Sequence, residues 1–326
     1  MTGRFTRRAA VAAIGAAMLP RHLNAQQAPA PVIGVRDSSA ATALKLSAFY
    51  EGLKVEGFSR NQNLTVEYHS AEGDYARLPE LAADLVNRRV ALITALGSPA
   101  ALAAKAATTK IPVVFAVGAN PIEIGLVASL NHPGANMTGV AGMAAGREQK
   151  RLELLYAAVP TAPVLGFLLN PENSNQDAQI NDVLASARKV SVQIRPIRAS
   201  TGRDFSNVFA ELVQSRAGGL VIADDEFLLG ASAELGSLAA RHSTPAIFQG
   251  TAFAAAGGLM SYGTRLAELY HQAGAYTGLV LAGAAPADLP IYQSTGVEMI
   301  VNLRSAKSLG IALPQAIVDQ ATTLIR

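Results

Sequence analysis

The feature that most constrains the fold of this chain is an internal repeat. Residues 31–35 (PVIGV) recur as residues 163–167 (PVLGF), and residues 111–115 (IPVVF) recur as residues 244–248 (TPAIF). Two further pairs keep the same order and a similar offset of about 130 residues: 74–75 with 204–205, and 83–89 with 210–216. The alternative is chance similarity in a chain rich in alanine, leucine and valine. The shared order of four segments favours two similar structural units.

Short β-branched runs alternate with alanine-rich helical stretches within the first unit. Strands are expected at 31–35, 64–69, 90–96 and 111–117, and helices at 42–57, 75–88 and 99–107. This alternation predicts parallel β-α-β units, and the continuous apolar strands predict helices on both faces of each sheet. The predicted fold class is therefore α/β, with two similar open, doubly wound parallel-sheet lobes and a ligand cleft between them.

The first 25 residues follow the order of a secretory signal peptide. Arg4, Arg7 and Arg8 give a basic start, residues 9–19 are apolar and uncharged, and Ala25 offers a small residue for cleavage. The apolar run is far shorter than the roughly 20 residues of a membrane-spanning helix. We therefore expect cleavage near Ala25 and a periplasmic protein, with the general secretory and twin-arginine routes both open.

Removing that segment changes the charge balance of the chain. The whole sequence has 27 lysines and arginines against 24 acidic residues, and residues 1–25 hold four of the arginines and no acid. The remainder is close to neutral, which argues against a nucleic-acid partner. The sequence has no cysteine, so a disulfide, a thiolate nucleophile and a lipid-modified cysteine are all excluded. We expect a soluble protein without a direct membrane anchor.

The sequence lacks the common signatures of enzymes. It contains no phosphate-binding loop, no glycine pattern of dinucleotide-binding proteins and no nucleophile elbow. The histidines lie too far apart for a compact helical metal site: His22, His69, His132, His242 and His271. We therefore predict that the protein is not an enzyme and binds neither a metal nor a cofactor. A catalytic group assembled from distant residues is the alternative.

Polar residues follow the predicted strands at the edges where the two lobes would face each other. Ser98 precedes Pro99 at a helix start, where free amides favour an anion, although plain capping is the alternative. Asp224 follows a strand, and it either binds a ligand ammonium or hydroxyl or caps a helix. The candidate ligand contacts are Asp37, Ser38, Ser39, Ser98, Asn120, Asn170, Asn173, Asp224, Phe227 and Tyr262.

The other candidates have structural alternatives as well. Asn170 and Asn173 stand in a polar turn, so they either contact the ligand or stabilise the turn itself. Phe227 and Tyr262 either stack on a ring of the ligand or pack in the core of the second lobe.

Five segments carry distinctive motifs: AEGDYARLP at 71–79, AAKAATTKIPVVF at 103–115, GLVASLNHPGANMTGV at 125–140, GGLMSYG at 257–263, and VNLRSAKSLG at 301–310. Together they resemble the ABC-transporter substrate-binding proteins of the tryptophan/tyrosine-binding type. The resemblance extends over essentially the whole chain after the signal segment.

The resemblance implies a type I periplasmic-binding-protein fold with three crossovers between its lobes. It places residues 30–140 and 249–284 in lobe 1, and residues 141–248 and 285–326 in lobe 2. Two departures concern the expected cleft. The family often has an acid where this chain has Asn120, and often has Pro-Phe where this chain has Asp225 and Glu226.

The function that follows is a periplasmic receptor of an ABC-type uptake transporter, with hinge closure around its ligand. Its ligand is expected to be a small organic anion or zwitterion, with aromatic amino acids and aromatic acids as candidates. Its partners would be a membrane permease and the ATPase of that permease, and the receptor itself is expected to be a monomer. A sensory co-receptor with the same fold is one alternative, and a two-lobed α/β enzyme is another.

Overall fold

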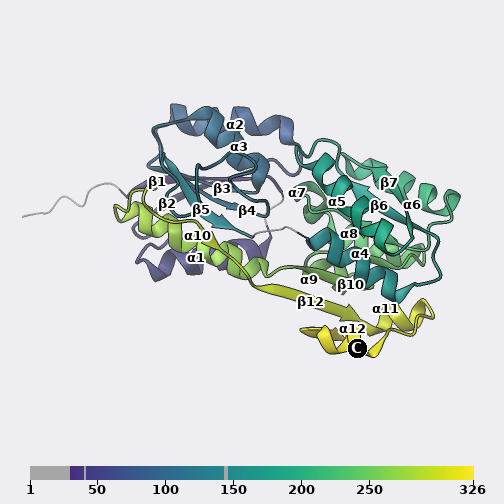
Figure 1. Cartoon of the computed structure of the whole chain (residues 1–326). Coiled ribbons are helices and arrows are strands. Elements are labelled where there is room, and N and C mark those ends of the chain that lie inside the picture. The colour runs from purple at the N-terminus through teal and green to yellow at the C-terminus, as the bar shows by residue number, and fades with distance from the viewer. Residues whose placement is uncertain (1–29, 40–41, 143–145) are drawn as a thin grey trace, which may run out of the picture.

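The computed structural model of the chain describes residues 30–39, 42–142 and 146–326. These residues form two α/β lobes that lie side by side, each built around its own sheet (Figure 1). The predicted signal segment, residues 1–25, lies outside the described residues. Within the described ranges, no helix is long and apolar enough to cross a membrane.

Parallel strands form the sheet of the first lobe, in the order β11-β5-β4-β3-β1-β2. The strands are β1 (Val32–Asp37), β2 (Thr65–Ser70), β3 (Leu92–Leu96), β4 (Val113–Val117), β5 (Met137–Ala141) and β11 (Tyr292–Gln293). Helices α2 (Leu78–Asn87) and α3 (Ser98–Ala107) cover one face of the sheet, and α1 (Ala43–Val55) and α10 (Leu266–Leu281) cover the other. Burial on both faces explains why these strands are continuous apolar runs.

The sheet of the second lobe has the order β13-β12-β10-β9-β8-β6-β7. Its strands are β6 (Val164–Leu169), β7 (Gln193–Arg198), β8 (Leu220–Ile222), β9 (Ala246–Phe248), β10 (Met260–Thr264), β12 (Val297–Asn302) and β13 (Thr323–Ile325). Helices α4 (Arg147–Ala158) and α5 (Gln176–Lys189) pack on one face, and α6 (Phe205–Gln214) and α8 (Ser232–Arg241) pack on the other.

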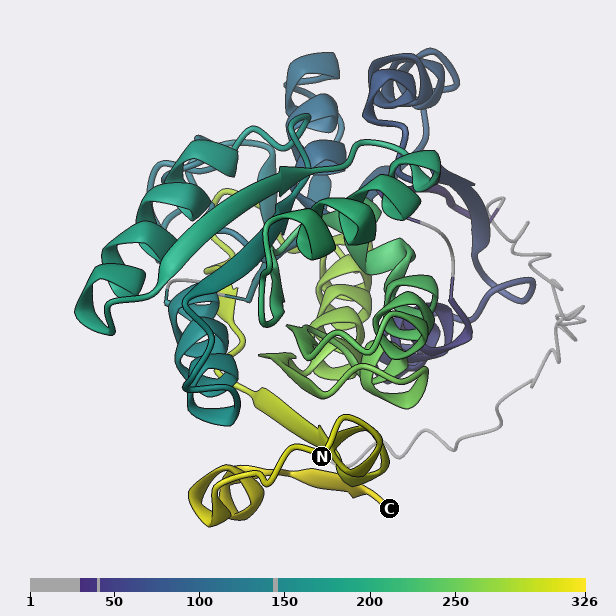
Figure 2. The ribbon, with the colours of Figure 1, turned by 90° about the vertical axis from the view of Figure 1, so that its right-hand side faces the viewer.

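Short helices complete this lobe. They are α7 (Glu226–Gly230), α9 (Thr251–Ala255), α11 (Leu303–Ser308) and α12 (Gln315–Gln320). The C-terminal segment from β12 to β13 lies along one edge of the second lobe, drawn in yellow in Figure 2.

The two sheets share one connectivity. In chain order, the first five strands of each lobe lie in the spatial order second, first, third, fourth, fifth. The internal repeat therefore corresponds to a repeated doubly wound unit, and the predicted α/β fold with two lobes is confirmed. One strand pair departs from the parallel pattern, because β12 runs antiparallel to β10.

The predicted boundaries of the lobes need two corrections. Residues 249–264 were assigned to the first lobe, but β10 pairs with β9 and β12 in the second sheet. Residues 285–293 were assigned to the second lobe, but β11 pairs with β5 in the first sheet. Both errors have one cause: strand composition does not reveal which sheet a strand joins, because that choice depends on distant partners.

Helices α1 and α10 of the first lobe approach each other through glycines. A Cβ atom added to Gly52 would lie 1.9 Å from the carbonyl oxygen of His271, and one added to Gly274 would lie 2.0 Å from the carbonyl oxygen of Phe49. The two backbones are therefore in direct contact, which no residue with a side chain would allow. This contact fixes the position of α10, whose first residues reach the ligand cavity described below.

We expect Gly274→Ala to destabilise the protein by about 1–3 kcal/mol, because the added methyl group must push the two backbones apart. On an open helix face the same change stabilises by up to about 1 kcal/mol, so the sign of the effect reports the contact. Urea unfolding followed by circular dichroism measures it. Gly202→Ala is the control, because a Cβ atom there meets nothing closer than Phe205, 4.0 Å away. Equal stability of the two variants would contradict the contact.

Candidate ligand-binding site

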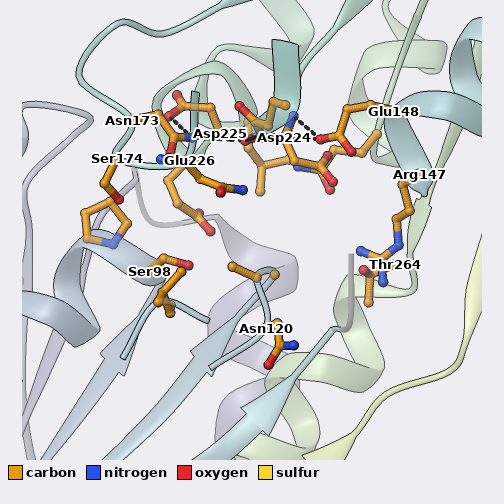
Figure 3. Close-up of a pocket in the computed structure, with 18 of the residues that line it drawn as sticks. Ser98, Asn120, Arg147, Glu148, Asn173, Ser174, Asp224, Asp225, Glu226 and Thr264 are labelled. Atoms are coloured by element: carbon orange, nitrogen blue, oxygen red, sulfur yellow. Dashed lines mark hydrogen bonds between the residues drawn. The ribbon is translucent and has the colours of Figure 1, made fainter. Parts of the chain in front are cut away.

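A cavity of about 170 Å³ lies between the lobes, at the carboxyl ends of strands from both sheets. Its wall draws on the loops after β3, β4 and β8, the last residue of β10 and the first turns of α4 and α5 (Figure 3). The polar residues of the wall include Tyr75, Ser98, Asn120, Arg147, Glu148, Asn173, Ser174, Gln179, Asp224, Asp225, Glu226 and Thr264. Parallel α/β sheets bind ligands at this edge, because the chain leaves each strand there in an adaptable loop.

Four of the ten predicted contacts line this cavity: Ser98, Asn120, Asn173 and Asp224. Ser98 opens α3, as expected, but the anion-binding character of that helix start is reduced. Pro99 has no N–H group, and the N–H of Ala100 donates to the hydroxyl of Ser38 at 3.0 Å. Ser38 therefore caps α3, and what remains at the cavity is Ser98 itself.

Asp37 and Ser39 lie behind the wall of the first lobe and do not line the cavity. Asp37 is fully buried, and both of its carboxylate oxygens accept hydrogen bonds from the Lys45 ammonium, at 2.9 and 2.7 Å. Its second oxygen also accepts from the hydroxyl of Tyr68. A carboxylate satisfied in this way stabilises the end of β1.

Asn170, Phe227 and Tyr262 also lie outside the wall. The side-chain amide of Asn170 is buried and donates to both oxygens of Asp225 at 3.3 Å. Phe227 stacks on Phe205, with 5.5 Å between ring centroids. Tyr262 packs against the core of the second lobe. In the structure these three side chains make turn or core contacts, which were the alternatives to ligand contact.

Hydrogen bonds join the two lobes directly beside the cavity. The Tyr75 hydroxyl of the first lobe donates to Oδ2 of Asp225 in the second lobe at 2.9 Å, and it accepts the N–H of Phe227 at 3.0 Å. Burial and the nearby acids raise the pKa of Tyr75, so its hydroxyl keeps its proton. The Ser39 hydroxyl reaches Oε2 of Glu226 at 3.4 Å. These contacts bridge the two lobes beside the cavity.

Asp225 is the centre of this interlobe contact. Besides Tyr75 and Asn170, it accepts from the amide of Asn173 at 3.1 Å and from the N–H of Leu228 at 3.0 Å, which caps α7. Burial raises its pKa, while these hydrogen bonds act in the opposite direction. These hydrogen bonds fix Asp225 within the second lobe and connect it to Tyr75 of the first lobe.

The second-lobe wall carries a buried cluster of charged groups. The guanidinium of Arg151 is fully buried and donates to Oδ1 of Asp224 at 2.6 Å. Glu148 is buried beside them, and its Oε1 accepts the N–H of Asp224 at 3.3 Å. Burial, and then the charge of Asp224, raise the pKa of Glu148 to about 7, against the opposing effect of Arg151.

Glu226 is a second carboxyl group in the cavity wall with a raised pKa. Burial raises its pKa to about 7; the Lys45 ammonium lowers it, and the carboxylates of Asp37 and Asp225 raise it. Of the described residues that line the cavity, Arg147 carries the one basic side chain. Burial lowers the pKa of Arg147, and its guanidinium donates to the carbonyl oxygen of Gly142.

The sequence of residues 35–325 matches the family of ABC transporter substrate binding proteins. The chain belongs to this family. The prediction made from the five motifs is thereby confirmed.

Individual relatives agree with this assignment. A tyrosine-binding protein of Clostridioides difficile (strain R20291) is 26% identical over 261 residues, which cover 80% of this chain and 75% of that protein. A domain from Streptococcus pneumoniae, solved in complex with L-Trp, is 25% identical, covers 90% of this chain and 99% of its own, and has a TM-score of 0.81. A conserved domain protein of Vibrio cholerae is 24% identical over the same shares, with a TM-score of 0.82, and shows the same fold.

Several cavity residues of this substrate-binding protein escaped the sequence analysis, notably Tyr75, Arg147, Glu148 and Gln179. Arg147 and Glu148 begin α4 directly after the chain passes from the first sheet to the second. The strand before them, β5, ends at Ala141 and is not among the strands expected from the sequence, so the search at strand ends did not reach them. The crossover itself was the available signal, since a segment that joins two lobes must pass close to the cleft.

We expect Tyr75→Phe to shift the unliganded protein toward an open arrangement, because the change removes both hydrogen bonds across the lobes. Each bond contributes about 0.5–1.5 kcal/mol, so the open population should rise severalfold. Small-angle X-ray scattering would then show a larger radius of gyration than for the unchanged protein. Tyr156→Phe is the control, because Tyr156 packs in the second-lobe core. A Tyr75→Phe protein as compact as the control would count against the contact as a latch.

Proposed function

We propose that this protein is the periplasmic receptor of an ABC-type uptake transporter. It binds a small organic zwitterion or anion in the interlobe cavity and presents the closed form to a membrane permease driven by an ATPase. The observation that carries the proposal is the cavity itself, which has both polar and apolar lining residues, lies at the strand ends of both lobes and is bridged by the Tyr75–Asp225 hydrogen bond. Closure around a ligand gives a permease a signal that distinguishes loaded from empty receptor.

Aromatic amino acids are the first ligands to test. The relatives named above include a tyrosine-binding protein and a domain in complex with L-Trp. In this chain, Tyr75, Leu229, Leu266, Leu269 and Tyr270 contribute apolar or aromatic surface to the cavity wall. They could hold an apolar side chain, while the charged cluster at Glu148 and Asp224 lies in the second-lobe part of the wall.

A thermal-shift screen tests the proposal. The protein is unfolded and refolded to strip any bound ligand, and then mixed with amino acids, aromatic acids, dicarboxylates, sugars and short peptides. A ligand at 100 times its Kd should stabilise the protein by roughly 2.7 kcal/mol. Gly118 lines the cavity and a Cβ atom there meets nothing within 4 Å, so Gly118→Leu should fill the cavity and abolish the shift.

The control variant is Gly202→Leu, which places the same side chain at an exposed position outside the cavity wall and should leave the ligand-induced shift intact. A shift that survives in Gly118→Leu would place the ligand elsewhere on the protein. Turnover of a candidate compound, with no stabilisation by any of them, would overturn the receptor function in favour of an enzyme.

Export is the part of the proposal that rests on residues 1–25. In cells that express the full chain, we expect the protein in the periplasmic extract with an N-terminus near Gln26, as measured by intact mass. A chain that begins at Gln26 should stay in the cytoplasm. Full-length protein retained in the cytoplasm would contradict the signal peptide.

A further inference from the structure

Two buried acceptors in the second-lobe wall have no hydrogen-bond partner among the described residues. They are Oδ2 of Asp224 and Oε1 of Gln179. The Gln179 side chain is only 6% exposed, and its Nε2 donates to the carbonyl oxygen of Asp224 at 2.7 Å and to Oε1 of Glu148 at 3.3 Å. Both of those partners accept, so the amide orientation is determined and its oxygen must face away from them.

The arginines nearby do not supply the missing donor. Arg151 is committed to the carbonyl oxygens of Tyr262 and Ile222, at 2.8 and 3.3 Å, as well as to Oδ1 of Asp224. Arg147 donates to the carbonyl oxygen of Gly142. A buried acceptor without a donor is unfavourable. The remaining sources are a proton on the Glu148 carboxyl group, a bound water and a donor that arrives with the ligand.

Glu148 can carry a proton when no ligand is bound and lose that proton when a ligand brings its own hydrogen-bond donor. Its charged neighbours on its own helix, α4, are Arg147 and Arg151. It also faces Asp224 in the loop after β8 and the side-chain amide of Gln179 on α5. With a pKa near 7, its carboxyl group holds a proton for part of the time at neutral pH. A cation bound beside it would favour the ionised form, and the proton would leave to solvent.

We propose that Glu148, Gln179 and Asp224 form an acceptor subsite for a ligand ammonium group, which displaces the proton of Glu148 when it binds, while Arg147 takes the ligand's carboxylate. Figure 3 shows Glu148 and Asp224 joined by a hydrogen bond, with Arg147 on the same side of the cavity near Thr264. The adjacent acceptors (Glu148 and Asp224) and donor (Arg147) match the α-ammonium and α-carboxylate groups of a free amino acid. The inference rests on the proposed function and narrows its ligand class from anions and zwitterions to amino acids.

Ligand chemistry gives the first test. Isothermal titration calorimetry would compare L-tyrosine and the other common amino acids with 3-(4-hydroxyphenyl)propionate, which lacks the ammonium group, and tyramine, which lacks the carboxylate. We expect at least one amino acid to bind and the deaminated and decarboxylated compounds to bind at least tenfold more weakly. Equal affinity for the deaminated acid would overturn the subsite but leave the receptor function standing. Binding of no amino acid, with binding of a sugar or dicarboxylate, would also overturn the subsite alone; binding of no compound would overturn both.

Proton linkage gives the second test. If the ammonium displaces a proton with a pKa near 7, the affinity of an amino acid should rise about tenfold from pH 6 to pH 8, with release of up to one proton. Titration in buffers of different ionisation enthalpy counts that proton. Glu148→Gln should lose most of this pH dependence, because the amide cannot ionise, and the slope that remains belongs to Glu226, whose pKa is also about 7.

The matched control is Glu153→Gln, the same change at an exposed position of α4, where the side chain pairs with Lys150. It should keep the pH dependence. A Glu148→Gln protein with the slope of the unchanged protein would overturn the proton exchange, as would an affinity of the unchanged protein that is equal at pH 6 and pH 8. Circular dichroism and the melting temperature show that both variants are folded.

Discussion

The buried guanidinium of Arg151 is the interaction on which the second-lobe half of the cavity depends. It connects α4 to the end of β8 and the middle of β10 through the carbonyl oxygens of Ile222 and Tyr262, and it fixes the side chain of Asp224. A buried guanidinium is tolerated only when its donors are satisfied, so the strands and the helix must keep this spacing. Asp224 in turn holds Glu148 and Gln179 through its own main chain. The positions of Asp224 and Glu148 in the wall therefore depend on one cation.

The first lobe uses the same principle with different residues. There the Lys45 ammonium is buried against Asp37 and Ser39, at the end of β1. Ser39 extends this network across the cleft to Glu226. Each lobe thus ends in a buried ion pair that positions its loops, and the lobes then meet through neutral or hydrogen-bonded groups. Such an arrangement leaves few unsatisfied groups in the cavity, and those that remain are informative about the ligand.

The fold could be predicted largely from the sequence, because the repeat and the alternation of strands and helices are local patterns. The same patterns predicted Ser98, Asn120, Asn173 and Asp224 as ligand contacts, and all four line the cavity, because each follows a strand at the edge that faces the cleft. Asp37, Asn170 and Phe227 also lie at or after strand ends, yet contacts with Lys45, Asp225 and Phe205 hold them away from the cavity. Sequence spacing does not reveal such partners. The membership of β10 and β11 was mistaken for the same reason.

Of the two departures from the pattern that the resemblance implies, Asn120 lines the cavity in place of an acid. The other, Asp225 and Glu226 in place of Pro-Phe, affects two parts of the cleft. Asp225 stands where proline is frequent, and its carboxylate accepts from Tyr75 of the opposite lobe, so the change bears on closure. Glu226 stands where phenylalanine is frequent and lines the cavity with a carboxyl group whose pKa is about 7. An apolar ring in that position would favour an apolar ligand group, whereas a buried carboxyl group favours a hydrogen-bond donor. Glu226 and the pair Glu148–Asp224 therefore give the cavity wall two sets of buried carboxyl groups that a ligand of this chain would have to satisfy.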